Sequence, residues 1–255
     1  MKKINVAYLL MPILSLLFLA SVAQAQGILS TKHNLSTGQA IAGNIRTTNG
    51  TGEVCVFCHT PHGADTTVAA PLWNRLINTG GSYTPYTSPS FDAGAANTAP
   101  APDGTSLACL SCHDGTIAFD ALRNLPGSGG FNDPAVSAGW AFERVGGGAI
   151  GNTMPAGITN LGTDLTNDHP ISMVYANALS PSSASGTNDH ATGFNDPPGG
   201  ISATGDSYFT TGVKISAGKV QCTSCHDPHR ADTPTFLRTN NTGSALCVTC
   251  HKKNV

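Results

Sequence analysis

The cysteines are the feature that most constrains what this 255-residue chain can fold into. All eight fall in C-x-x-C pairs, and a histidine directly follows the second cysteine of every pair. We number these segments motifs 1 to 4 in chain order, at residues 55–59, 109–113, 222–226 and 247–251. No cysteine lies outside a motif, so one explanation has to serve for all eight thiols.

Three common uses of cysteine pairs fit this pattern poorly. Disulfides are the usual fate of cysteine in an exported protein, but they require neither the fixed spacing nor the histidine. Zinc ribbons use paired C-x-x-C, yet a histidine directly after every second cysteine serves no zinc geometry. A thioredoxin-type thiol pair would not recur four times with a histidine each time. The pattern instead predicts c-type haem attachment.

Haem attachment gives the spacing a physical reason. Two thiols three residues apart can reach the two vinyl groups on one porphyrin edge, and the turn between them lays the next side chain over the iron. A neutral imidazole is a suitable ligand there. We therefore predict four haems c. The predicted thioether bonds come from Cys55, Cys58, Cys109, Cys112, Cys222, Cys225, Cys247 and Cys250, and the proximal iron ligands are His59, His113, His226 and His251.

The histidines outside the motifs are enough to supply a second ligand to every iron. They are His33, His62, His169, His190 and His229. His62 and His229 each follow a motif histidine by three residues, with a proline before them, so we predict that each binds the iron of a neighbouring haem. His33 and His169 are the other two predicted distal ligands. His190 lies in a stretch rich in Ser, Gly and Asn, and it is the spare.

Bis-histidine ligation leaves no iron position for a substrate, which predicts electron transfer and no enzymatic activity. Met154 and Met173 leave a His/Met haem open as an alternative for one site. A reductase of a small nitrogen or sulfur oxyanion is the alternative from a different class. Such an enzyme needs an iron with an open or lysine-ligated position and typically a cationic pocket, whereas this chain has a formal net charge of −2. Nothing in the composition indicates a nucleic-acid partner.

The first 25 residues predict export. Lys2 and Lys3 precede an apolar run over 6–22, and Ala23-Gln24-Ala25 has the small-x-small form of a cleavage site, which predicts a mature chain of residues 26–255. An uncleaved membrane anchor is the alternative. No later run is apolar over a spanning length, so no membrane span is expected after cleavage. We expect a secreted protein, extracellular or at the cell surface, with the periplasm as the alternative location.

Composition predicts a fold that is mostly coil with short helices. The chain has 29 glycines and 16 prolines, and only 6% of its residues are aromatic. Few large side chains are therefore present to build an apolar core. Four porphyrins, each tied to the chain covalently and again through a distal histidine, would supply that interior. We predict one haem-cored domain over residues 26–255, with little regular secondary structure.

Local patterns refine this expectation. Short helical turns are predicted at the four motifs, and short strands at 171–176 and 207–217. The pattern over 114–122 does not distinguish a helix from a strand. Coil is predicted for the segments without hydrophobic periodicity, which are 76–107, 125–163 and 180–206.

Several short stretches resemble a known family. They are Lys32-His33-Asn34-Leu35-Ser36, the form C-x-x-C-H-x-P-H at 55–62 and 222–229, and Asp168-His169-Pro170-Ile171. These are similar to multihaem c-type cytochromes with doubled C-x-x-C-H motifs. Within that group, the chain resembles extracellular tetrahaem cytochromes that polymerise into conducting filaments.

The resemblance implies bis-histidine haems in a continuous chain, with His33, His62, His169 and His229 as distal ligands. It also implies a head-to-tail homopolymer in which an adjacent subunit supplies one ligand, through an interface that does not close on itself. Other cytochromes, extracellular metal oxides or electrodes are the implied electron acceptors. A monomeric periplasmic electron shuttle is the alternative within the same chemistry.

Overall fold

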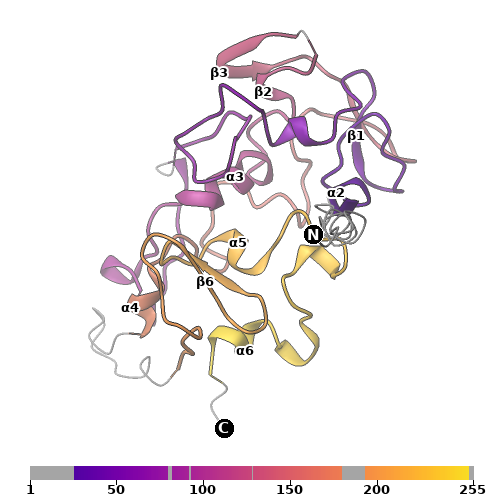
Figure 1. The fold of residues 1–255 in the computed structure, drawn as a ribbon. Helices are drawn as coiled ribbons and strands as arrows, with labels where there is room; N and C mark the ends of the chain where they lie inside the picture. Colours follow the sequence, from indigo (N-terminus) through magenta and orange to yellow (C-terminus); the bar gives the residue numbers. More distant parts are fainter. Residues whose placement is uncertain (1–25, 80–81, 92, 128, 180–192, 253–255) are drawn as a thin grey trace, which may run out of the picture.

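A computed structural model describes residues 26–79, 82–91, 93–127, 129–179 and 193–252 (Figure 1). The predicted signal peptide at 1–25 and the spare histidine, His190, lie outside the described residues. Coil predominates, as the composition predicted. Among the described residues, no helix has the length and apolar character needed to cross a membrane.

Helical segments are short, and four of them carry the motifs, which confirms the predicted helical turns. These four are η1 (Cys55–Phe57), α3 (Gly104–His113), α5 (Cys222–Cys225) and α6 (Cys247–Cys250). The others are α2 (Gln26–Leu29), η3 (Ala95–Asn97), α4 (Tyr175–Leu179), η4 (Pro234–Phe236) and η5 (Thr242–Ser244). Figure 1 shows α3, α5 and α6 following one another towards the C-terminal end of the molecule.

The strands form three small antiparallel sheets. Strands β1 (Ile45–Thr47), β4 (Phe142–Arg144) and β5 (Gly148–Ile150) make one sheet in the order β1-β4-β5. Strand β2 (Ala121–Asn124) pairs with β3 (Phe131–Ser137), and β6 (Asp206–Tyr208) pairs with β7 (Lys214–Ser216). The β6–β7 hairpin confirms the strands predicted within 207–217, and β2 begins only at the end of the undecided segment 114–122.

One of the local predictions is wrong. Segment 171–176 is not a strand, because only Val174 makes a bridge, to Lys219, and α4 begins at Tyr175. Coil dominates segment 125–163, as predicted, but β3, β4 and β5 also lie within it. Its glycines serve as turns between strands: Gly146, with φ of 79°, lies in the left-handed region between β4 and β5.

Apolar packing is divided among three clusters that lie beside the motifs. One contains Phe57, Phe119 and Phe142 and packs against Cys58 and Cys112. A second includes Leu107 and Leu110 of α3, with Trp73 and Tyr83. The third contains Tyr175, Phe209, Val213 and Ile215, with Cys250 against it. Cys58, Cys112 and Cys250 are thus partly buried at the margins of the packed regions. The single domain over 26–255 stays a prediction.

Candidate functional site

All eight cysteines are free thiols in the structure, and they form no disulfides with one another. Interactions between cysteines of different motifs show that motifs that follow one another in the sequence are also neighbours in space. Burial raises the pKa of Cys58 to about 12, and the nearby Cys112 thiol of motif 2 adds to that rise. A hydrogen bond with Cys222 of motif 3 raises the pKa of Cys109. Motif 1 thus adjoins motif 2, and motif 2 adjoins motif 3.

The same relation continues to motif 4. Burial raises the pKa of Cys225 to about 11, and the next cause is the Cys250 thiol of motif 4. Each motif thus has a cysteine near one of the following motif. This serial arrangement could not be deduced from spacing, because groups far apart in the sequence are in contact: the Cys222 amide and the Ser106 hydroxyl, 116 positions apart along the chain, are hydrogen-bonded.

A buried polar network joins α3, which carries motif 2, to α5, which carries motif 3. The Ser106 amide donates to Gln221 Oε1 over 3.1 Å, and the Cys222 amide donates to Ser106 Oγ over 3.1 Å. The Thr105 and Thr223 hydroxyls are 2.8 Å apart. Gln221 is only 4% exposed, so these bonds are shielded from water. The network fixes the relative position of the two motifs.

Three motif histidines are oriented by main-chain carbonyls. His59 Nδ1 lies 2.7 Å from Pro71 O, His113 Nδ1 lies 2.7 Å from Thr159 O, and His226 Nδ1 lies 2.8 Å from Thr235 O. A carbonyl can only accept, so each Nδ1 carries the proton and donates it. Each Nε2 then presents a lone pair, which is the tautomer that a metal-binding imidazole needs.

The structure pairs three motif histidines with histidines from distant segments. The pairs are His59 with His229 at 6.1 Å between ring centroids, His113 with His33 at 6.1 Å, and His251 with His169 at 6.4 Å. Two imidazoles that bind one metal from opposite sides, through bonds of about 2 Å, have their centroids roughly 6 Å apart. All three separations match that geometry.

Buried polar atoms beside these pairs lack partners among the described residues. They include His33 Nδ1 and Trp73 Nε1. The Trp73 ring lies 6.1 Å from that of His59, and burial lowers the pKa of His33 to about 4, which keeps the ring neutral as a metal ligand must be. Buried donors in proteins are rarely left unpaired. The neutral His33 ring and the spacing of the three histidine pairs therefore fit a metal-centred group held between imidazoles.

The predicted ligands His62 and His226 are not brought together with a second imidazole. Both are exposed, and neither makes a ring contact with another histidine of the described chain. The backbone of His62 is nevertheless fixed, because its carbonyl accepts from Asn124 Nδ2 over 2.8 Å. Among the described residues, His226 thus makes no ring contact with a histidine like those that His59, His113 and His251 make.

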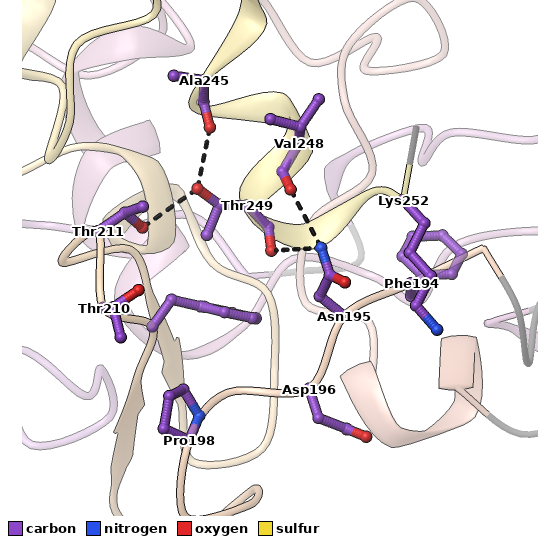
Figure 2. Close-up of a pocket in the computed structure, with 11 residues that line it drawn as sticks. Phe194, Asn195, Asp196, Pro198, Thr210, Thr211, Ala245, Val248, Thr249 and Lys252 are labelled. Carbon is purple, nitrogen blue, oxygen red and sulfur yellow. Dashed lines mark hydrogen bonds between the residues drawn. The ribbon is translucent and has the colours of Figure 1, made fainter. Parts of the chain in front are cut away.

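A pocket of about 560 Å³ lies beside motif 4 (Figure 2). Its lining includes Val248 and Thr249, the residues between the two cysteines, but neither cysteine nor His251. Asn195 Nδ2 donates to the carbonyls of Val248, over 3.1 Å, and Thr249, over 3.2 Å. Phe194, which also lines the pocket, lies with its ring 4.7 Å from that of His251, so the pocket adjoins motif 4, and Asn195 holds α6 in place.

Sequence reasoning missed three residues that hold the motifs in place: Arg75, Asn195 and Gln221. Arg75 Nη2 donates to the Ser111 carbonyl of motif 2 over 3.0 Å, Asn195 bonds motif 4, and Gln221 bonds Ser106 of the helix that carries motif 2. Each of these contacts joins segments that are distant in the sequence. None of the three residues carries a spacing or periodicity signal by which it could have been found.

A family model described as Doubled CXXCH motif matches residues 215–255, which contain motifs 3 and 4. No curated protein matches the chain. The C-x-x-C-H motifs imply covalent haem c, and the match indicates a haem-binding region like that of c-type cytochromes. Electron transfer is the chemistry that such a region performs.

Proposed function

We propose that this protein is an exported electron carrier with four covalently attached bis-histidine haems, which works as a subunit of an extracellular filament. The observation that carries the proposal is the set of three histidine pairs, each 6.1 to 6.4 Å between centroids. Each pair joins a motif histidine to a histidine from a distant segment. At motifs 1, 2 and 4 that arrangement supports irons with two protein ligands and no position for a substrate, as an electron carrier requires.

The chain's own residues divide the work in this proposal. The motif cysteines would hold the porphyrins by thioether bonds, and the motif histidines would bind the irons through Nε2. His229, His33 and His169 would be the second ligands at motifs 1, 2 and 4. Bound haem supplies a one-electron Fe(III)/Fe(II) couple. Main-chain carbonyls hold the motif imidazoles in one tautomer and orientation, so that ligation does not change with redox state.

The serial order of the motifs supports transport along the molecule. Cys58 neighbours Cys112, Cys109 neighbours Cys222, and Cys225 neighbours Cys250. Thioether bonds at these positions would keep successive haems close together. The hydrogen bonds between α3 and α5 would keep the distance between the haems at motifs 2 and 3 constant.

Two unpaired histidines support assembly through iron ligation between copies. His226 lacks a distal partner in the described chain, and His62 is an exposed imidazole on a fixed backbone. In the proposed filament, His62 of one copy binds the iron at motif 3 of the next, which gives a head-to-tail contact that does not close. The competing source of that ligand is His190 of the same chain, outside the described residues.

Haem number is tested by intact mass and absorption spectroscopy of the exported protein. We expect the mass of residues 26–255 plus four haems, and a low-spin ferric spectrum in the assembled protein. Fewer haems, or retention of residues 1–25, would contradict the proposal. Electron microscopy of the extracellular fraction then tests assembly. Filaments are expected, whereas an exclusively monomeric protein confined to the periplasm would support the shuttle instead.

The ligand at motif 3 is tested by a matched pair of variants. His62→Ala is expected to remain monomeric, with four haems and one high-spin ferric site. His190→Ala is expected to assemble and stay fully low-spin. The reverse pattern would assign His190 as the ligand and remove the argument for ligation between copies.

A further inference from the structure

Arg75 is a guanidinium buried completely inside the protein, with 0% exposure. Its donors reach only neutral acceptors. Nε donates to Ser111 Oγ over 3.1 Å, and Nη2 donates to the carbonyls of Ser111, over 3.0 Å, and Ala118, over 2.9 Å. Nη1 donates to the Phe119 carbonyl. Within the described chain, no carboxylate forms an ion pair with Arg75, so its charge is solvated by dipoles but not neutralised.

The backbone places this charge between motifs 1 and 2. The preceding residue, Asn74, donates its amide to the Cys58 carbonyl of motif 1 over 2.9 Å, and Arg75 itself bridges to Leu122 of β2. On the other side, Ser111 is one of the two residues between the cysteines of motif 2. Arg75 therefore touches motif 2 directly and is one residue from a contact with motif 1.

The nearest carboxylates are bonded to other groups. Asp114 and Asp120 are buried in the same region. Asp114 accepts from Asn78 Nδ2 over 2.8 Å and from the Tyr83 hydroxyl over 2.7 Å. Asp120 accepts from the Ser137 hydroxyl and the Trp140 amide. Neither carboxylate contacts the guanidinium, so among the described residues the positive charge beside the two motifs has no counter-ion.

Motif 3 provides an internal comparison. Arg238 Nε donates to the carbonyl of Thr223, between the cysteines of that motif, over 2.6 Å. Its Nη1, however, lies 3.3 Å from the Asp227 carboxylate, so the charge is paired. Motifs 2 and 3 are thus each bonded by a different arginine. Of these two, only Arg75 lacks a counter-ion among the described residues.

We propose that the positive charge of Arg75 raises the reduction potentials of the haems attached at motifs 1 and 2. This inference rests on the proposed haem attachment. Each iron takes up one electron, from Fe(III) to Fe(II), with no bond made or broken. A fixed cation in a low-dielectric interior stabilises the state with the extra electron. The two motifs nearest Arg75 then hold electrons more strongly than they would beside a neutral side chain.

The test is a spectroelectrochemical titration of the holoprotein, after intact mass has established its haem number. Arg75→Gln removes the charge, and Arg75→Lys keeps it. We expect Arg75→Gln to move about half of the titration amplitude to more negative potentials. A tenfold change in the ratio of reduced to oxidised haem corresponds to about 59 mV for a one-electron couple. Arg75→Lys should restore most of the wild-type curve.

Two further variants keep the test decisive. Arg144→Gln removes a positive charge from a partly exposed position in β4, where solvent screens it, and should leave the curve unchanged. If Arg75→Gln does not fold, Ser111→Asp places a carboxylate beside the guanidinium and should shift the same half of the amplitude, whereas Ser111→Asn should not.

An unshifted curve, an equal shift in Arg75→Lys and Arg75→Gln, or a uniform shift of all the amplitude would overturn the role of Arg75. Fewer than four haems in the wild-type mass would instead overturn the proposed function, so the two failures are distinguishable.

Discussion

Replacing Gln221 with alanine should destabilise the protein and change the relation between motifs 2 and 3. The Gln221 side chain accepts from the Ser106 amide and hydroxyl and donates to Asp103 Oδ1 over 2.9 Å. A buried neutral hydrogen bond contributes about 1 kcal/mol, and a buried donor left without a partner costs about 1–3 kcal/mol. Asp103 is partly exposed and adds little. We expect a loss of about 2–4 kcal/mol in the free energy of unfolding.

Gln39→Ala is the matched control. Gln39 is 2% exposed, and its amide donates to Thr31 O over 3.0 Å and to Asn34 O over 3.2 Å, while its oxygen accepts from the Ile41 amide over 2.6 Å. Its three bonds stay within one N-terminal segment. The two variants should therefore lose similar stability, but only Gln221→Ala should disturb the contact between two motifs.

Guanidinium chloride unfolding of the holoprotein measures the stability, with the midpoint and slope compared between variants. Circular dichroism in the Soret band measures the coupling between neighbouring haems. We expect the Soret signal to change in Gln221→Ala and to remain that of the wild type in Gln39→Ala. Equal changes in both variants, or a loss below about 0.5 kcal/mol in Gln221→Ala, would refute this reasoning.

Three more variants test other contacts. Asn74→Ala should lower the free energy of unfolding by about 2–4 kcal/mol. The buried Asn74 side chain donates to Val56 O over 2.7 Å and to the Asn124 carbonyl, and it accepts from the Asn124 amide. The control Asn49→Ala, at an exposed site, should lower that free energy by less than about 0.5 kcal/mol in the same assay. Gly27→Ala should lower the free energy of unfolding by about 1–3 kcal/mol, because the added Cβ would lie 1.9 Å from the His229 carbonyl oxygen. It should also disturb the low-spin signal expected from the His59–His229 pair. Gly151→Ala, with open space around it, is the control. Burial raises the pKa of Asp206, but Lys214 at 2.8 Å and other donors outweigh burial and lower the pKa below the usual value of 3.8. The ionised carboxylate therefore stabilises the fold fully above about pH 4, and this stabilisation is lost as the pH falls through the folded-state pKa. The free energy of unfolding of Asp206→Asn should lack this acid dependence.

The attachment chemistry could be predicted from the sequence because it is local. Two cysteines and a histidine within five residues define a motif whatever the rest of the chain does, and the same holds for the helical turns at η1, α3, α5 and α6. The high glycine and proline content predicted the dominance of coil. It gave no sign of the short strands within 125–163, where glycines such as Gly146 form turns between strands, since strand pairing depends on partners elsewhere in the chain.

Only the tertiary structure decided which histidines meet. Counting predicted that His33, His169 and His229 were available, but their partners His113, His251 and His59 follow from contacts between distant segments. The uncompensated charge of Arg75 depends likewise on carbonyls 36 to 44 residues away along the chain. Covalent spacing thus determined where the cofactor attaches. The contacts between histidines and the surroundings of Arg75 come from packing between distant segments, which no local pattern encodes.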